Sequence, residues 1–245
     1  MGSTSAPFTP KALSFFRQLA KNNKREWFQP RKETFDELIR LPMIELVGQI
    51  NDDLRKFAVD YVAADPAKVI YRIYRDTRFS KDKTPYKTHI AAHFQHQRLP
   101  KNRAGGLYFS VSHTGVEIAG GIYMPGPEEL AAVREAIARK PKMFEKVMTH
   151  SALVRKMGPL RGDGLARVPK GYPPDHVAAE WLRKKHFYFD LTLDASHALK
   201  PSLRKTVVDS FRLLLPVVDY FNTAVLAAIK PAASDDRPKR PEPMF

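Results

Sequence analysis

Residues 107–123, LYFSVSHTGVEIAGGIY, decide the fold of this chain. Apolar and polar side chains alternate on both sides of a turn-like His-Thr-Gly sequence, and a period of two residues is typical of a β-strand with one buried face. The stretch therefore predicts an antiparallel hairpin of strands 107–112 and 116–123. Gly120 and Gly121 in the second strand indicate either a β-bulge or a place where the backbone closely approaches another group.

Three further segments extend this hairpin into a sheet. Residues 69–74 are rich in β-branched and aromatic side chains, which strands prefer. Residues 89–94 alternate between two faces, and residues 187–193 return as a strand after a long polar region. We therefore expect a mainly antiparallel sheet, in which the strands of residues 69–123 form a meander.

Helical periodicity dominates the two ends of the chain. Thr9 and Pro10 provide a helix start, because threonine caps helices and proline suits the first turn. Pro42 marks a joint or kink between two helical segments, and Pro216 is expected to interrupt the last one. Two helices are predicted to start at residues 10 and 127. Four further helical segments are predicted at residues 30–40, 42–57, 143–149 and 201–229.

These patterns predict an α+β fold with a single domain, in which the sheet packs against the N-terminal and C-terminal helices. Residues 1–8 are expected to form a flexible leader and residues 9–230 the domain. Residues 231–245 are proline-rich and are expected to form a mobile tail. Residues 158–174 are rich in glycine and proline, which predicts a long irregular loop.

The formal net charge of +15 is concentrated in two segments. Residues 72–89 carry six basic residues against two aspartates, and residues 139–185 carry twelve basic against four acidic residues. Concentrated positive charge attracts phosphates and nucleic acids. The expected partner is therefore an anionic small molecule or a polyanion, nucleic acid included, with simple solubility of the surface as the alternative.

Composition excludes several classes of protein. The chain has no cysteine, which excludes disulfides, zinc ribbons, iron–sulfur clusters and thiol nucleophiles. No apolar run approaches the ~18 residues that cross a bilayer, and the N-terminus lacks an export signal. We therefore expect a soluble cytoplasmic protein without a membrane partner. Nothing in the sequence indicates an oligomeric state.

The segment 72–89, RIYRDTRFSKDKTPYKTH, is the main candidate site. Its cations would repel one another unless an anion completed the site, because two aspartates neutralise only part of the charge. Arginine makes bidentate contacts with phosphate or carboxylate, and lysine acts as a mobile point charge. The candidate ligand-binding residues are Arg72, Arg75, Arg78, Lys81, Lys83 and Lys87.

The same segment offers groups for catalysis. Asp76 or Asp82 could serve as a base or metal ligand, and His89 could carry a proton in an enzyme that acts on a phosphoryl or acyl group. The structural alternative is that Arg75 and Arg78 pair with carboxylates and fasten the segment, which would then be a folding nucleus.

Motifs for metals and cofactors are weak. In an extended strand His89 and His93 lie about 13 Å apart, too far to bind one ion, so no metal is expected at His89, His93 and His96. The chain has no P-loop, dinucleotide fingerprint or serine elbow, and it therefore indicates no particular cofactor. Aromatic residues such as Tyr86, Tyr108, Phe109 and Tyr123 could stack on bases, although in a sheet such residues more often form the core.

Several segments together resemble one family. They are FFRQLAKNNKREWF (15–28), the block at 75–89 with the pattern RDxRFSKDKxPYKxH, the glycine pair of the hairpin, VPKGYPPDH (168–176) and LRKKHF (182–187). In this order they are similar to the domain of unknown function 2461 family of bacterial and fungal proteins. The resemblance covers nearly the whole chain and implies a single α+β domain whose biochemistry is unassigned.

Overall fold

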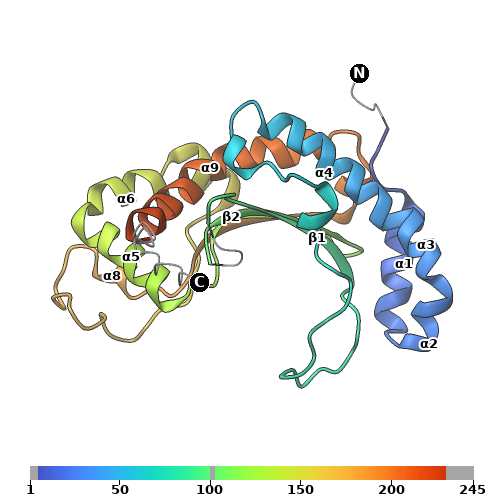
Figure 1. Ribbon diagram of the computed structural model, residues 1–245, viewed down its shortest axis with the longest axis horizontal. Coiled ribbons are helices and arrows are strands. Elements are labelled where there is room, and N and C mark those ends of the chain that lie inside the picture. Colours follow the sequence, from blue (N-terminus) through green and yellow to red (C-terminus); the bar gives the residue numbers. More distant parts are fainter. Residues whose placement is uncertain (1–4, 100–102, 230–245) are drawn as a thin grey trace, which may run out of the picture.

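A four-stranded antiparallel sheet forms the centre of the molecule (Figure 1). The computed structural model describes residues 5–99 and 103–229. The strands β1 (His89–Gln95), β2 (Gly106–Ser112), β3 (Val116–Ile122) and β4 (Phe187–Leu193) follow one another in space as they do along the chain. The predicted α+β class and the meander order are therefore confirmed.

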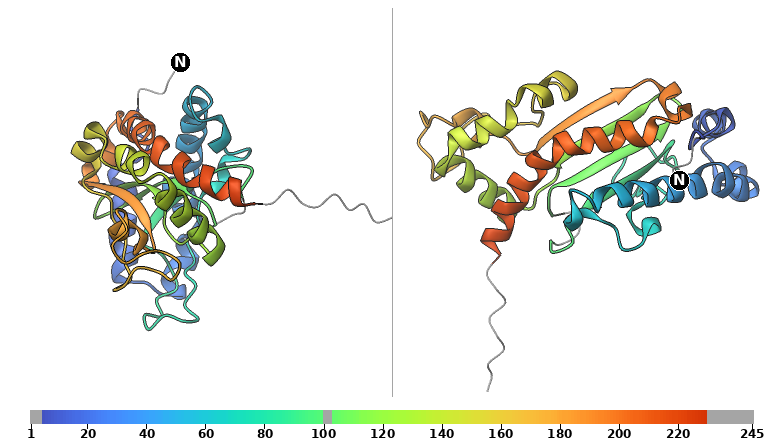
Figure 2. Two further views of the ribbon diagram at one scale, coloured as in Figure 1. Left: turned by 90° about the vertical axis from the view of Figure 1, so that its left-hand side faces the viewer. Right: turned by 90° about the horizontal axis from the view of Figure 1, so that it is seen from above.

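The sheet has one apolar and one polar face, because successive side chains of a strand point to opposite sides. The apolar side chains of β1 to β3, such as Phe94, Phe109 and Ile118, are fully buried. They face α9 (Leu203–Ala228), which packs against β2 and β3, and α9 in turn packs against α4 (Leu41–Leu54). Both helices therefore lie on one side of the sheet (Figure 2).

The glycine pair in β3 marks a close approach and not a bulge. Pairing with both neighbouring strands continues through Gly120 and Gly121 without an extra residue. A Cβ atom on Gly120 would lie 3.0 Å from the Cβ of Leu214 in α9, so this glycine lets the helix settle onto the sheet.

The N-terminal helices form a layer beside β1. They are α1 (Pro10–Lys21), α2 (Arg25–Phe28), the 3-10 turn Gln29–Arg31, α3 (Lys32–Phe35), a π-helical segment (Asp36–Arg40) and α4. Helical backbone continues from the π-helical segment through Pro42, since Arg40, which precedes α4, itself has helical φ and ψ. The chain therefore has a π-helical turn before Pro42 in place of the expected joint.

The second half of the chain is also helical on its outer side. Four helices lie between β3 and β4 along the chain: α5 (Pro127–Arg139), α6 (Pro141–Met148), α7 (Ser151–Met157) and α8 (Ala179–Leu182). Short 3-10 turns occur before β1, at Val59–Tyr61 and Pro66–Val69, and after β4, at Ala195–Leu199. The expected interruption at Pro216 is wrong, because α9 runs through this residue and only changes direction along its length (Figure 2).

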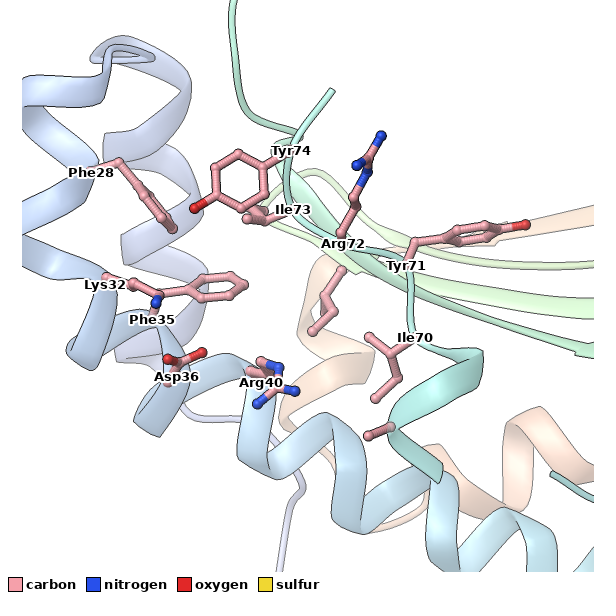
Figure 3. Close-up of a pocket in the computed structure, with 12 residues that line it drawn as sticks. Phe28, Lys32, Phe35, Asp36, Arg40, Ile70, Tyr71, Arg72, Ile73 and Tyr74 are labelled. Carbon is pink, nitrogen blue, oxygen red and sulfur yellow. The ribbon is translucent and has the colours of Figure 1, made fainter. Parts of the chain in front are cut away.

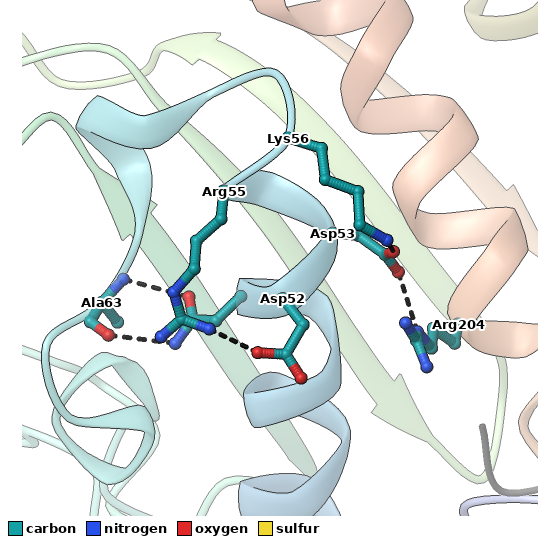
Figure 4. Close-up of polar contacts among 7 residues, drawn as sticks. Asp52, Asp53, Arg55, Lys56, Ala63 and Arg204 are labelled. Atoms are coloured by element: carbon teal, nitrogen blue, oxygen red, sulfur yellow. Dashed lines mark hydrogen bonds and ion pairs between the residues drawn. The ribbon is translucent and has the colours of Figure 1, made fainter. Parts of the chain in front are cut away.

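Polar contacts fasten α4 to its surroundings (Figure 4). The guanidinium Nε of Arg204 in α9 lies 2.8 Å from Asp53, which also accepts a hydrogen bond from Lys56 at 3.0 Å. The amide of Asn51 exchanges two 3.0 Å hydrogen bonds with the backbone of Ala63. These contacts hold the N-terminal layer against the C-terminal helix.

The expected strand at residues 69–74 is a second correction. Only isolated bridges form there, Ile70 with Ala92 and Tyr74 with Tyr86. The β-branched and aromatic side chains serve packing on different sides of an irregular segment, since Ile73 is buried whereas Tyr71 and Tyr74 are exposed. Strand composition therefore does not produce a strand here.

The N-terminal end of the expected domain lies next to a residue of the hydrophobic core. Phe8 is buried in the core with 2% of its surface exposed, one residue before the expected start of the domain. Residues 1–4 and residues 230–245, which include the expected tail, lie outside the described part of the chain.

Helix α9 is the one helix in the described ranges whose length and composition would allow it to cross a membrane. Its side chains Phe211, Leu214 and Phe221 are fully buried against the protein core. The core helix of a globular domain meets the same criteria, so we assign α9 to the core. The cytoplasmic location stays a prediction.

Candidate functional site

The basic segment forms a projecting arm, residues 71–88, between the 3-10 turn Pro66–Val69 and strand β1 (Figure 1). Its two limbs run antiparallel, because Arg75 N–H donates to the carbonyl of Pro85 at 2.9 Å and Lys87 N–H donates to that of Ile73 at 2.8 Å. The arm projects on the side of the sheet opposite α4 and α9.

Tyr86 anchors the base of the arm to the N-terminal helices. Its ring is 1% exposed and stacks on Phe28 with 4.2 Å between the ring centroids. The side-chain amide of Asn23 donates to the carbonyl of Tyr86 at 2.9 Å and accepts from its N–H at 3.0 Å. Aromatic packing and two hydrogen bonds therefore hold the base of the arm against the N-terminal helices.

Two of the three arginines are already paired within the arm. Arg75 contacts Asp82 and the hydroxyl of Thr84, and Arg78 binds Asp76 through Nε at 3.0 Å and Nη2 at 2.8 Å. Two of the six candidate cations therefore already have a counter-charge within the arm. The internal ion pairs that formed the structural alternative are present, with Arg75 and Arg78 each bound to an aspartate of the arm.

The remaining cations have no carboxylate partner within the described residues. Lys83 donates to the carbonyl of Thr77 at 2.9 Å, and Lys87 donates to the carbonyl of Arg72 at 3.1 Å. The Lys87 ammonium lies 5.0 Å from the centre of the Tyr71 ring. Burial and the nearby charge of Arg72 lower the pKa of Lys87.

A cleft of about 340 Å³ lies between the arm and the start of β1, and we call it the arm cleft. Its lining includes Asn23, Arg75, Asp82, Thr84, Lys87 and His89. Four of the expected site residues therefore share one cleft. Arg78, Lys81, Lys83 and Asp76 do not line it.

Arg72 belongs to a second cavity of about 240 Å³ on the other side of the arm. Phe28 and Phe35 form part of its apolar wall, and the side chain of Arg72 points away from these rings (Figure 3). Three of the six candidate cations therefore line a cavity, Arg72 this one and Arg75 and Lys87 the arm cleft.

The electrostatics of the candidate catalytic groups favour pairing over proton transfer. Hydrogen bonds from Arg78 lower the pKa of Asp76 to about 2, and the Thr84 backbone N–H, followed by Arg75, lowers that of Asp82 to about 2. Carboxylates with such a pKa take up a proton weakly at neutral pH. Burial, followed by the charge of Lys87, lowers the pKa of His89, so its imidazole is neutral at pH 7.

The polar face of the sheet adjoins the arm cleft and was not identified from the sequence. His89 starts this face on β1, and the strand register places polar and aromatic residues beside it. They are His93, Tyr108, Ser110, Ser112, Glu117, Tyr188, Asp190 and Thr192. These residues occupy alternate positions of four separate strands. Only the pairing register, which the sequence does not give, brings them together on one face.

Two carboxylates lie near the middle of this face. Glu117 pairs with Thr192 in the register, so Asp190 on β4 is its diagonal neighbour. The Nε of Arg161 lies 2.8 Å from Asp190. Desolvation by the surrounding protein, followed by the negative charge of Asp190, raises the pKa of Glu117.

Asp190→Asn is expected to lower the pKa of Glu117, because the substitution removes a like charge from its neighbour. Titration of the Glu117 side-chain carboxyl carbon by NMR in both proteins measures the change. Asp194→Asn, which removes a carboxylate at the end of β4, is the matched control and is expected to leave that titration in place. An unchanged or higher Glu117 pKa in Asp190→Asn would contradict the assigned coupling.

No group of three or more histidine or acidic side chains in the described ranges is arranged to hold a metal ion. His93 instead contacts Tyr71, whose hydroxyl lies 3.1 Å from its Nδ1. Burial lowers the pKa of His93 to about 4, which keeps the ring neutral.

Comparison with known proteins gives one match. The model of a family described as "Conserved hypothetical protein (DUF2461)" matches residues 11–220. No curated protein and no solved structure matches the chain. The match spans every strand and every part of the site described above.

Proposed function

This chain belongs to the DUF2461 family of conserved hypothetical proteins, and from that starting point we propose that it binds an anionic ligand, a phosphate or a carboxylate, in the arm cleft. Lys87 carries the proposal. This residue is half-buried and lines the cleft, and its ammonium has no carboxylate within 4 Å among the described residues. A desolvated cation without a counter-charge gains free energy when an anion binds beside it.

The other groups of the cleft suit the same ligand. The Arg75 guanidinium lines the cleft, and Asp82 and Thr84 hold it in place. Neutral His89 and the amide of Asn23 can each donate a hydrogen bond to an oxyanion. One net positive charge remains in the cleft when Arg75, Lys87 and Asp82 are taken together, and it attracts an anionic ligand.

Lys87→Met is expected to weaken the binding of inorganic pyrophosphate about tenfold or more, because a charge-assisted hydrogen bond to a half-buried lysine is lost. Isothermal titration calorimetry in low salt measures this change. Lys81→Met removes the same charge from a residue outside the cleft, and it is expected to change the affinity far less. Equal losses in the two variants would show that only overall charge matters.

The pH dependence gives a second measurement on the same proteins. Because the pKa of Lys87 is lowered, wild-type affinity should fall as the pH rises through that pKa, since the ammonium loses its charge there. Lys87→Met should lack this fall. Wild-type protein that gives neither heat nor amide NMR shifts at Lys87 and His89 with millimolar pyrophosphate does not have the proposed site.

A further inference from the structure

The polar face of the sheet is partly open, although Ala91 on β1 and Ser110 on β2 are buried. On the apolar side α9 covers β2 and β3, whereas on the polar side Tyr108, Tyr188 and Asp190 are partly exposed and Glu117 and Thr192 are exposed. Their rows follow from the register, in which Tyr108 pairs with Ala119 and Ala119 pairs with Asp190. The face is therefore a rigid surface whose side chains are fixed by strand pairing.

Aromatic rings gather at two places on this face. Near β1 the rings of Tyr71 and His93 stack with 6.2 Å between centroids, and His93 pairs across the strands with Tyr108. Near the start of β4 the ring centroid of Tyr188 lies 5.2 Å from that of Tyr123. Tyr71 is 41% exposed and Tyr123 is 61% exposed, so these two side chains are not part of the hydrophobic core.

Cations lie on both sides of the open face. The arm, on the β1 side, contributes Arg72, Lys81 and Lys83, and its Phe79 is 94% exposed. Residues 161–185, on the β4 side, contribute the exposed cations Arg167, Lys170 and Lys185. Within the described ranges no carboxylate pairs with any of these six cations. Both segments project on the side of the sheet away from α9 (Figures 1 and 2).

The middle of the face offers hydrogen-bond acceptors. Glu117 and Asp190 present carboxylate oxygens, and Ser110 pairs directly opposite Glu117. Carboxylates accept hydrogen bonds from the N–H groups of bases, including the N3–H of uracil. Arg161 offsets the charge of Asp190, so the acceptors lie between the two cationic borders without dominating the field.

We infer that the open sheet face binds single-stranded nucleic acid, with bases stacked on Tyr108 and Tyr188 and phosphates held by the arm. Four-stranded sheets with exposed rings stack two or three bases in this way, and a basic border follows the backbone. A duplex hides the faces of its bases and could use only the charge. The inference rests on the proposed anion binding of the arm, and the phosphates would be those of the nucleic-acid backbone.

The experiment measures fluorescence anisotropy with a labelled 12-nucleotide oligouridine, an abasic 12-mer with the same phosphates, and a 12-base-pair duplex RNA. Wild-type protein is expected to bind oligouridine about tenfold or more tightly than the abasic strand, because stacking contributes only to the former. The logarithm of the affinity should fall linearly with that of salt, by roughly 0.7 for each phosphate neutralised.

Variants separate stacking from charge. Tyr108→Ala and Tyr188→Ala are expected to weaken oligouridine binding about tenfold each while leaving the abasic strand and pyrophosphate unaffected. Tyr108→Phe keeps the ring and is expected to bind like wild type. Lys81→Ala with Lys83→Ala should weaken both strands equally. Circular dichroism checks the fold of each variant, and Tyr188→Ala serves alone if Tyr108→Ala does not fold.

Equal affinity for oligouridine and the abasic strand would overturn the inference, as would duplex binding as tight as single-strand binding, or no binding of oligouridine at 50 mM salt. If pyrophosphate binding still depends on Lys87 in any of these three cases, the proposed function of the arm cleft stands. Loss of pyrophosphate binding without loss of the oligouridine preference would overturn the arm cleft alone.

Discussion

Gly121→Ala is expected to lower the free energy of unfolding by about 3 kcal/mol or more, one of the two largest effects we expect from a single substitution. Gly121 has a φ of +143°, which residues with a side chain rarely adopt. An added Cβ would lie 2.1 Å from the carbonyl oxygen of Phe187 and 2.6 Å from the Cα of Tyr188. Both atoms belong to the backbone of β4, so they cannot move aside without breaking the strand pairing.

Gly158→Ala is the matched control for this prediction. Gly158 also has a positive φ, +78°, but nothing lies within 4 Å of an added Cβ there. Only the backbone strain remains, and the expected cost is roughly 1–3 kcal/mol. Urea unfolding followed by circular dichroism compares the two variants. Equal losses would show that β4 yields to the new methyl group and that the close approach is not rigid.

The sheet was predictable where alternation is regular. The hairpin at residues 107–123 and strand β4 satisfy one rule, that apolar side chains recur every second residue toward a single core. Residues 69–74 have the same composition, but Ile73 is buried whereas Tyr71 and Tyr74 are exposed, so no continuous apolar face forms. Composition therefore identified strands only where one face faces the core.

Helix boundaries at proline were harder to predict. A proline alone cannot show whether it stands in the first turn of a helix or inside it. Pro42 stands in the first turn of α4 after a π-helical segment, and Pro216 stands inside a helix that is held on one side by the sheet. Tertiary packing supplies what the missing hydrogen bond at Pro216 takes away.

The arm was found from its charge, but its internal pairing was not resolved. Asp76 pairs with Arg78 two residues on, and Asp82 pairs with Arg75 seven residues back. The second pair depends on the antiparallel limbs of the arm, which no local pattern specifies. Lys87 was one of six equivalent cations in the sequence, and only its place in the cleft distinguishes it.

The open sheet face needs contacts between distant parts of the chain. Tyr108, Glu117 and Asp190 are single polar residues on three strands, and each is unremarkable within its own strand. Register places Tyr108 and Asp190 in one row, and diagonal pairing places Glu117 beside Asp190. A one-residue slip of any strand would send its residue into the core, so the site and the fold depend on the same pairing.

Tyr86→Ala is expected to destabilise the protein by about 3–5 kcal/mol, the usual cost of removing a large aromatic side chain from a packed interior. Tyr86 packs between Phe28, at 4.2 Å between centroids, and Tyr74, at 5.5 Å. Loss of the ring removes its stacking on Phe28, while the two hydrogen bonds between the Asn23 amide and the backbone of residue 86 can remain. Thermal and urea unfolding measure the loss.

Tyr86→Phe separates the ring from its hydroxyl. The Tyr86 hydroxyl is buried and has no hydrogen-bond partner among the described residues, so its removal is expected to leave stability unchanged or slightly raised. A loss above about 1 kcal/mol in Tyr86→Phe, comparable to that of a removed hydrogen bond, would show that the hydroxyl is paired in solution. Because Tyr86 also lines the arm cleft, stable Tyr86→Phe protein with weaker pyrophosphate binding would assign the hydroxyl to the ligand.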